Sequence, residues 1–109
     1  MKYLLAFAFL TMALVGAEAQ SRDGKNRHVV IINASTVTVA IFNASSVVQR
    51  TWQEDLLSNR VLAPGQRINA NIDDGTGHCM YDLRAVMADG RQVISRNVNI
   101  CAISEWVVR

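Results

Sequence analysis

Residues 79–101, CMYDLRAVMADGRQVISRNVNIC, decide the fold that this chain is expected to adopt. Two runs typical of β-strands flank Asp89-Gly90, and a cysteine ends each run. Asp-Gly between such runs is a strong hairpin signal, because a tight turn needs positive φ and glycine adopts it without a steric penalty. The stretch therefore predicts a β-hairpin, and we expect a Cys79–Cys101 disulfide to join its open ends.

The register of this hairpin depends on the length of its loop. With Asp89 and Gly90 as the two loop residues, Cys79 faces Ile100, one position short of Cys101. A three-residue loop or a single β-bulge is expected to close that gap. Alternation on the first strand places Cys79, Tyr81, Leu83, Ala85 and Met87 on one face, and Met80, Asp82, Arg84 and Val86 on the other.

The start of the chain has the pattern of a secretory signal peptide. Lys2 precedes an apolar run at 4–16, and Ala17-Glu18-Ala19 matches the small-x-small cleavage pattern. The run is short for a membrane span, which needs about 20 residues. We expect residues 1–19 to be removed, so that Gln20 begins a periplasmic or secreted protein exported by the general secretory pathway.

Size and charge narrow the classes of function. Cleavage would leave 90 of the 109 residues, enough for one domain with a modest core. The net charge would stay at +2, because Lys2 and Glu18 are lost together. A charge so small and scattered argues against nucleic-acid partners and against strong attraction to an anionic membrane. Two cysteines in an exported chain favour one disulfide.

The remaining pattern predicts a single β domain over 28–109. The polar segment 20–27 has no apolar period and is expected to be a flexible arm. Besides the hairpin, strands are expected at 28–33, 36–42, 67–72 and 104–108, with a turn at Pro64-Gly65. In 36–42, alternation places Val37, Val39 and Ile41 on one face. About six short strands without a helical period predict an all-β fold, a small antiparallel sandwich or open barrel.

The segment 43–60 is the least regular part of the chain. We expect a long loop with one short helical turn capped by Asp55, and long loops often carry function. Trp52 and Trp106 are expected to be core residues more often than binding anchors. The possible binding residues are Trp52, Asp55, Asp82 and Arg84. Asp82 and Arg84 lie on one side of a strand and are expected to pair with each other or with a neighbouring strand.

No motif assigns a catalytic residue or a cofactor to this chain. It has no Gly-x-Ser-x-Gly sequence, and a disulfide would leave no cysteine thiolate. A periplasmic metal-binding protein using His78 and Met80 is the main alternative, although consecutive strand residues point to opposite faces. A small hydrolase using His28 or His78 is a third. The first expectation is an exported module that binds an envelope protein or a glycan.

The chain also resembles an uncharacterised family of small secreted bacterial proteins, chiefly from proteobacteria. Three motifs carry the resemblance: Trp-Gly-x-Asp-Leu-Leu-Gly, Leu-x-Pro-Gly and Cys-x-Tyr-Asp-Leu-Arg. The matching residues are Trp52, Asp55, Leu56, Leu57, Leu62, Pro64, Gly65, Cys79, Tyr81, Asp82, Leu83 and Arg84. Gln53 and Ser58 depart from the pattern, which has glycine at both positions. The resemblance implies an extracytoplasmic β domain with the Cys79–Cys101 bridge and supplies no activity.

Overall fold

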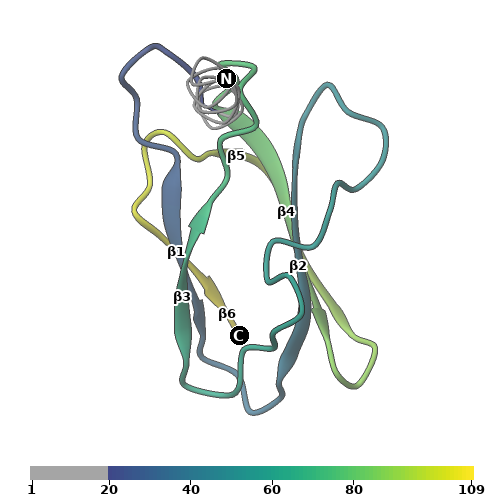
Figure 1. Ribbon diagram of the computed structural model, residues 1–109. Coiled ribbons are helices and arrows are strands. Elements are labelled where there is room, and N and C mark those ends of the chain that lie inside the picture. Colours follow the sequence, from purple (N-terminus) through teal and green to yellow (C-terminus); the bar gives the residue numbers. More distant parts are fainter. Residues whose placement is uncertain (1–19) are drawn as a thin grey trace, which may run out of the picture.

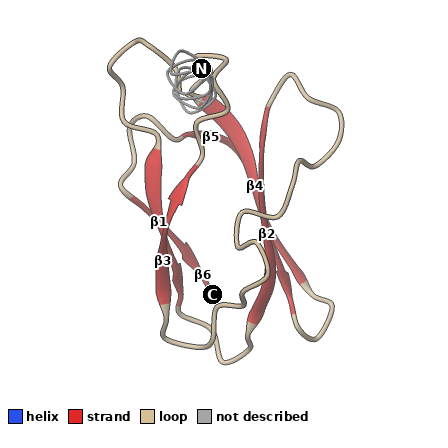
Figure 2. Ribbon diagram, viewed as in Figure 1, coloured by secondary structure: helices blue, strands red, loops and turns tan. Residues whose placement is uncertain are grey.

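The computed structural model describes residues 20–109, so the expected signal peptide at 1–19 lies outside the described residues. Six β-strands and no helix are found in the described part of the chain, which confirms the all-β prediction (Figures 1 and 2). The strands are β1 (His28–Asn33), β2 (Val39–Ser46), β3 (Arg67–Asn71), β4 (Met80–Met87), β5 (Gln92–Asn99) and β6 (Glu105–Val108). Within residues 20–109, no helix is long and apolar enough to cross a membrane.

The strands form two three-stranded sheets that face each other as a sandwich (Figure 1). One sheet has the order β3-β1-β6 and the other the order β2-β4-β5. All pairings are antiparallel, as expected, except that of β1 with β6, which is parallel. The first and last strands of the described chain therefore lie side by side.

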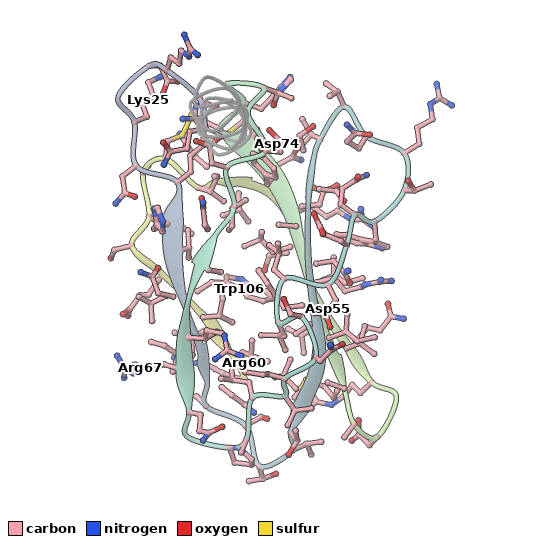
Figure 3. All side chains as sticks on the ribbon, in the orientation of Figure 1. Lys25, Asp55, Arg60, Arg67, Asp74 and Trp106 are labelled. Atoms are coloured by element: carbon pink, nitrogen blue, oxygen red, sulfur yellow. A yellow bond between two sulfur atoms is a disulfide. The ribbon has the colours of Figure 1, made fainter. Side chains whose placement is uncertain are left out.

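The core lies between the two sheets. Burial alternates along β4, where Tyr81, Leu83, Ala85 and Met87 are each no more than 1% exposed. The predicted shared face of these four residues is confirmed, and it points into the core. Trp106 of β6 lies between the two sheets (Figure 3) and is also buried. Its ring lies 5.7 Å from that of Phe42 in the opposite sheet. These contacts confirm the expectation that Trp106 is a core residue.

The hairpin of β4 and β5 has an unexpected register. Its loop has three residues, 88–90, because Met87 N–H donates to the carbonyl oxygen of Arg91. A bulge then places an extra β5 residue between the Leu83–Ser95 and Tyr81–Val98 pairs. The three-residue loop and the bulge were expected to be alternatives, but both are present. The loop shifts the register by one residue in one direction, and the bulge shifts it by one residue in the other. Their effects cancel.

Cys79 consequently faces residue 100, and the gap to Cys101 is closed by a turn. Ile100 N–H donates to the Cys79 carbonyl at 2.9 Å, after which the Ala102 N–H donates back to the Asn99 carbonyl. This turn brings the Cα atoms of Cys79 and Cys101 to 5.4 Å, and the predicted disulfide is present. The open end of the hairpin is therefore covalently closed, although neither the loop nor the bulge aligned the cysteines.

The predicted alternation in the 36–42 segment is wrong. A register irregularity between Val39 and Ile41 interrupts the pairing of β2 with β4. As a result Val39 and Phe42 are both fully buried, whereas Ile41 is 36% exposed. A bulge reverses the inward and outward sides of a strand from that point onward. Asn43 and Ser45 therefore follow Ile41 onto the outer side of the β2-β4-β5 sheet.

The segment that follows β2 is shorter than expected as a loop, because β2 continues to Ser46. It contains a turn near Asp55 but no helix. The turn at Pro64-Gly65 is present, since Gln66 N–H donates to the Ala63 carbonyl and Gly65 has a φ of 83°. The connection therefore runs from the edge of one sheet to the edge of the other (Figure 1).

Candidate functional site

Polar side chains gather on the outer side of the β2-β4-β5 sheet, away from the core. Strand pairing places Asn43 beside Arg84 and Ser45 beside Asp82. Arg96 belongs to the bulge of β5, which lies opposite Asp82. Because residues two apart on a strand share one side, Asp82 and Arg84 both point outward. The sheet thus supplies a rigid support for five polar side chains.

The loop after β2 is fastened to this side of the sheet by two nearly buried side chains. Asn43 Nδ2 donates to the carbonyl oxygen of Gln53 at 2.8 Å. Ser45 Oγ donates to the Thr51 carbonyl and accepts the Gln53 N–H, both at 3.0 Å. Both side chains are on residues only 4% exposed, so these hydrogen bonds are shielded from water. They fix the backbone on either side of Trp52.

Trp52 stacks against two arginines of the sheet and is only partly buried. The guanidinium carbon of Arg84 lies 4.7 Å from the centre of its ring, and that of Arg96 lies 5.5 Å away. Both distances are within the range of cation–π attraction. Trp52 is not among the buried core residues. The expectation that it belongs to the core is therefore wrong, because its ring packs on guanidinium groups outside the sandwich.

The two arginines are held to different degrees. Arg84 Nε and Nη2 both donate to Asn43 Oδ1, at 3.1 and 2.8 Å. Arg96 donates one hydrogen bond, from Nη1 to Asp82 Oδ2 at 3.1 Å, and its side chain is 62% exposed. Asp82 also accepts the N–H of Asn97, a residue of the bulge with a φ of 55°. Asp82 and Arg84 therefore pair with neighbouring strands and not with each other.

Trp52, Asp82 and Arg96 border a hollow of about 130 Å³. It is lined by Ser45, Gln49, Arg50, Thr51, Trp52, Asp82 and Arg96. Two positive groups and one negative group surround it, so its charge favours an anionic ligand. We call Trp52, Asp82, Arg84 and Arg96 together the Trp52 face.

Asp55, the fourth predicted binding residue, lies outside the Trp52 face. Its Oδ1 atom accepts the N–H of Phe42 at 2.9 Å and the N–H of Leu57 at 3.0 Å. The carboxylate thereby joins the loop to the free edge of β2 and caps the turn, as expected for its local position (Figure 3). Its role is structural.

Arg96 is the member of the Trp52 face that sequence reasoning missed. The signal was present in the hairpin, because counting back from the turn places Asp82 opposite residue 97 for a two-residue loop and opposite Arg96 for the three-residue loop 88–90. An acidic residue facing a basic one across two strands predicts a cross-strand ion pair.

A second polar cluster ties residues 20–27 to the segment before β4. The side chain of Arg27, 1% exposed, donates from Nη1 and Nη2 to the two carboxylate oxygens of Asp23. It also donates to the carbonyls of Gly77 and His78, at 2.9 and 2.8 Å. Nη2 lies 3.6 Å from Cys79 Sγ. We call these residues the Arg27 cluster.

The Arg27 cluster changes the interpretation of the N-terminal segment. The segment 20–27 was expected to be a flexible arm, yet it holds a buried arginine and is also bonded through Ser21 to Asp73. The hydrogen bonds from Arg27, the N–H of Lys25 and the positive charge of Arg27 lower the pKa of Asp23 far below its ordinary value. The polar sequence of 20–27 gave no sign of these contacts, because they are made with residues some 50 positions later in the chain.

His78 makes a local contact in the segment before β4. His78 Nδ1 lies 2.9 Å from Thr76 Oγ1, whose proton is donated to Asp74. His78 must then donate to Thr76, so it is not placed to deprotonate that hydroxyl. Cys79 is oxidised, and among residues 20–109 no cluster of three or more His, Cys, Asp or Glu could hold a metal ion.

Comparisons with known protein families, with curated proteins and with solved structures gave no match to this chain. The function must therefore be argued from the two polar clusters themselves. The arginine of one cluster is buried and fully bonded, whereas the arginine of the other, Arg96, is exposed beside an aromatic ring.

Proposed function

We propose that this chain is an exported binding module that engages a protein or glycan of the cell envelope through the Trp52 face. The observation that carries the proposal is Arg96. This side chain is 62% exposed, yet Asp82 and the ring of Trp52 hold it in place. A charged group that is ordered before binding loses less conformational entropy when a ligand arrives.

The composition of the Trp52 face also fits recognition. Tryptophan and arginine are the residue types most enriched among those that dominate binding energy at interfaces. Here both are mounted on a sheet and a fastened loop, and rigid mounting favours precise contacts. The disulfide is compatible with an oxidising compartment. Together with the signal-peptide pattern and the resemblance to secreted bacterial proteins, it supports export.

Affinity capture tests this proposal. The full chain, expressed with its own N-terminal segment and recovered from the exported fraction, is immobilised and exposed to solubilised envelope extract. We expect a retained protein or glycan whose yield falls sharply with Trp52→Ala. Arg67→Gln is the matched control, because Arg67 is exposed on β3 of the other sheet (Figure 3).

Two outcomes would contradict the proposal. Equal capture by the Trp52→Ala variant and the parent chain would remove the Trp52 face from the interaction. A chain that keeps residues 1–19 and stays in the cytoplasm would remove the assignment to the envelope. The intact mass of the recovered protein reports this directly, because cleavage after Ala19 leaves Gln20 as the first residue.

A further inference from the structure

The hollow of the Trp52 face offers hydrogen-bond donors that the protein itself does not use. Arg96 contributes Nη1 to Asp82, whereas its Nε and Nη2 make no hydrogen bond to residues 20–109. Arg50 lies on the rim of the same hollow. A guanidinium group presents a planar fork of N–H donors that matches the two oxygens of a carboxylate. The free side of Arg96 is therefore suited to bind a carboxylate.

Asp82 restricts the charge that the ligand can carry. Its carboxylate lines the same hollow and lies 3.1 Å from Arg96. A group with two negative charges, such as a phosphate monoester, would be repelled by Asp82 more strongly than a single carboxylate. Asp82 can also accept hydrogen bonds, as it does from Asn97. A ligand that carries hydroxyl groups beside one carboxylate would use both residues.

The remaining lining points to the same chemistry. Gln49 and Thr51 add an amide and a hydroxyl, and Trp52 is the aromatic residue of the hollow. Polar side chains next to one aromatic ring are suited to a ligand with many hydroxyls and a few C–H surfaces. We infer that the hollow binds a uronic-acid unit of an acidic polysaccharide. This inference rests on the proposed function and names its ligand class.

An acidic peptide is the competing ligand, and the strand beside the hollow disfavours it. Peptides commonly bind by adding a strand to a free sheet edge. β5 is an edge strand, but the bulge at Arg96 and Asn97 interrupts its regular backbone pattern next to the hollow. A bulge bends and twists an edge and thereby hinders the addition of another strand.

Titration with defined oligomers tests the inference. The full chain, in the form recovered after export, is titrated with tri-galacturonate, maltotriose, tri-glutamate and inorganic phosphate by calorimetry and by ¹⁵N NMR. We expect tri-galacturonate to bind and to shift the signals of Ser45, Asp82, Arg96 and the Trp52 indole. Arg96→Gln should weaken this binding by about tenfold or more, because a hydrogen-bonded charge pair is lost. Arg67→Gln should leave it unchanged.

The inference and the proposed function fail in different ways. The uronic-acid assignment is overturned if maltotriose, tri-glutamate or phosphate binds as tightly as tri-galacturonate, or if tri-galacturonate does not bind. It is also overturned if Arg96→Gln, shown by NMR to be folded, binds like the parent chain. In each case, the proposed function would still be supported if the parent chain captured a component of the envelope extract and the Trp52→Ala variant did not. Loss of that capture would instead refute the binding face itself.

Discussion

The two ion pairs among the described residues, Arg27–Asp23 and Arg96–Asp82, place the same two residue types in opposite environments. Arg27 is 1% exposed and all three of its guanidinium nitrogens are bonded. The side chain of Arg96 is 62% exposed and donates one hydrogen bond to the protein. A buried charge is tolerated only when its partners are complete, whereas an exposed one can be left available.

The difference shows that the fold engages one of these arginines completely and leaves the other accessible to solvent. Arg27 is bonded to Asp23, four positions earlier, and to Gly77 and His78, which lie 50 and 51 positions later, next to the disulfide-bonded Cys79. The cluster therefore joins distant parts of the fold. Arg96 is hydrogen-bonded only across its own hairpin, and its other contact is with the partly buried ring of Trp52. Variants of the two arginines should therefore affect different measurements.

The largest expected effect is the loss of stability in Arg27→Ala. The substitution leaves the carbonyls of Gly77 and His78 without their donor and opens a cavity where a long side chain was packed. We expect the free energy of unfolding to fall by about 3 kcal/mol, measured by urea denaturation. Arg22→Ala, an exposed residue of the same segment, should change it by less than about 0.5 kcal/mol. Similar stability of the two variants would contradict a structural role for Arg27.

A smaller effect is expected when acid protonates Asp23. The pKa of this carboxyl is lowered by the hydrogen bonds from Arg27, so it is lower in the folded than in the unfolded chain. The stability linked to this difference is present above the ordinary pKa of 3.8 and is lost as the pH falls toward the folded-state value. The thermal unfolding temperature, measured between about pH 6 and about pH 2, should fall as this stability is lost.

Arg27→Ala supplies the control for the acid experiment. Removing the guanidinium group removes the largest cause of the lowered pKa of Asp23, so the decline in stability below the ordinary pKa should become shallower. An identical pH dependence in the parent chain and the variant would show that other carboxyl groups cause the acid sensitivity.

The smallest expected change in stability belongs to Arg96→Gln. The Arg96–Asp82 pair is exposed on the arginine side, and pairs of this kind contribute about 0–1 kcal/mol. Asp82 keeps its hydrogen bond from the Asn97 N–H in the variant, so the bulge should persist. We expect the midpoint of urea denaturation to stay nearly constant while the affinity for tri-galacturonate falls. A large loss of stability would make Arg96 a structural residue like Arg27.

Regular alternation predicted much of this fold correctly, and irregular backbone caused the errors. The strand at 28–33, the buried side of β4 and the disulfide follow from patterns within single segments. A two-residue register led to the correct facing of Cys79 and Ile100, although the loop has three residues and a bulge compensates for it. Bulges leave little trace in the order of polar and apolar residues. The same limitation explains the error at Ile41, where the alternation changes sides.

The candidate site was predictable where its contacts are local and hidden where they are distant. Asp82 and Arg84 stood out because alternation places both on the polar side of one strand. Trp52 was assigned to the core because its size and hydrophobicity usually lead to burial, and the arginines that cover it come from two strands more than 30 positions away. Arg27 could not be recognised as buried, since a polar segment gives no sign of a partner 50 positions later.

The parallel pairing of β1 with β6 also constrains the order in which the chain can fold. β1 is the first strand to be synthesised, and β6 completes its sheet only when residues 105–108 become available. The β2-β4-β5 sheet is complete in sequence by residue 99 and can form earlier. Contacts between residues so far apart in sequence slow the folding of a domain. The sandwich can therefore be completed only when almost all of residues 20–109 have been made.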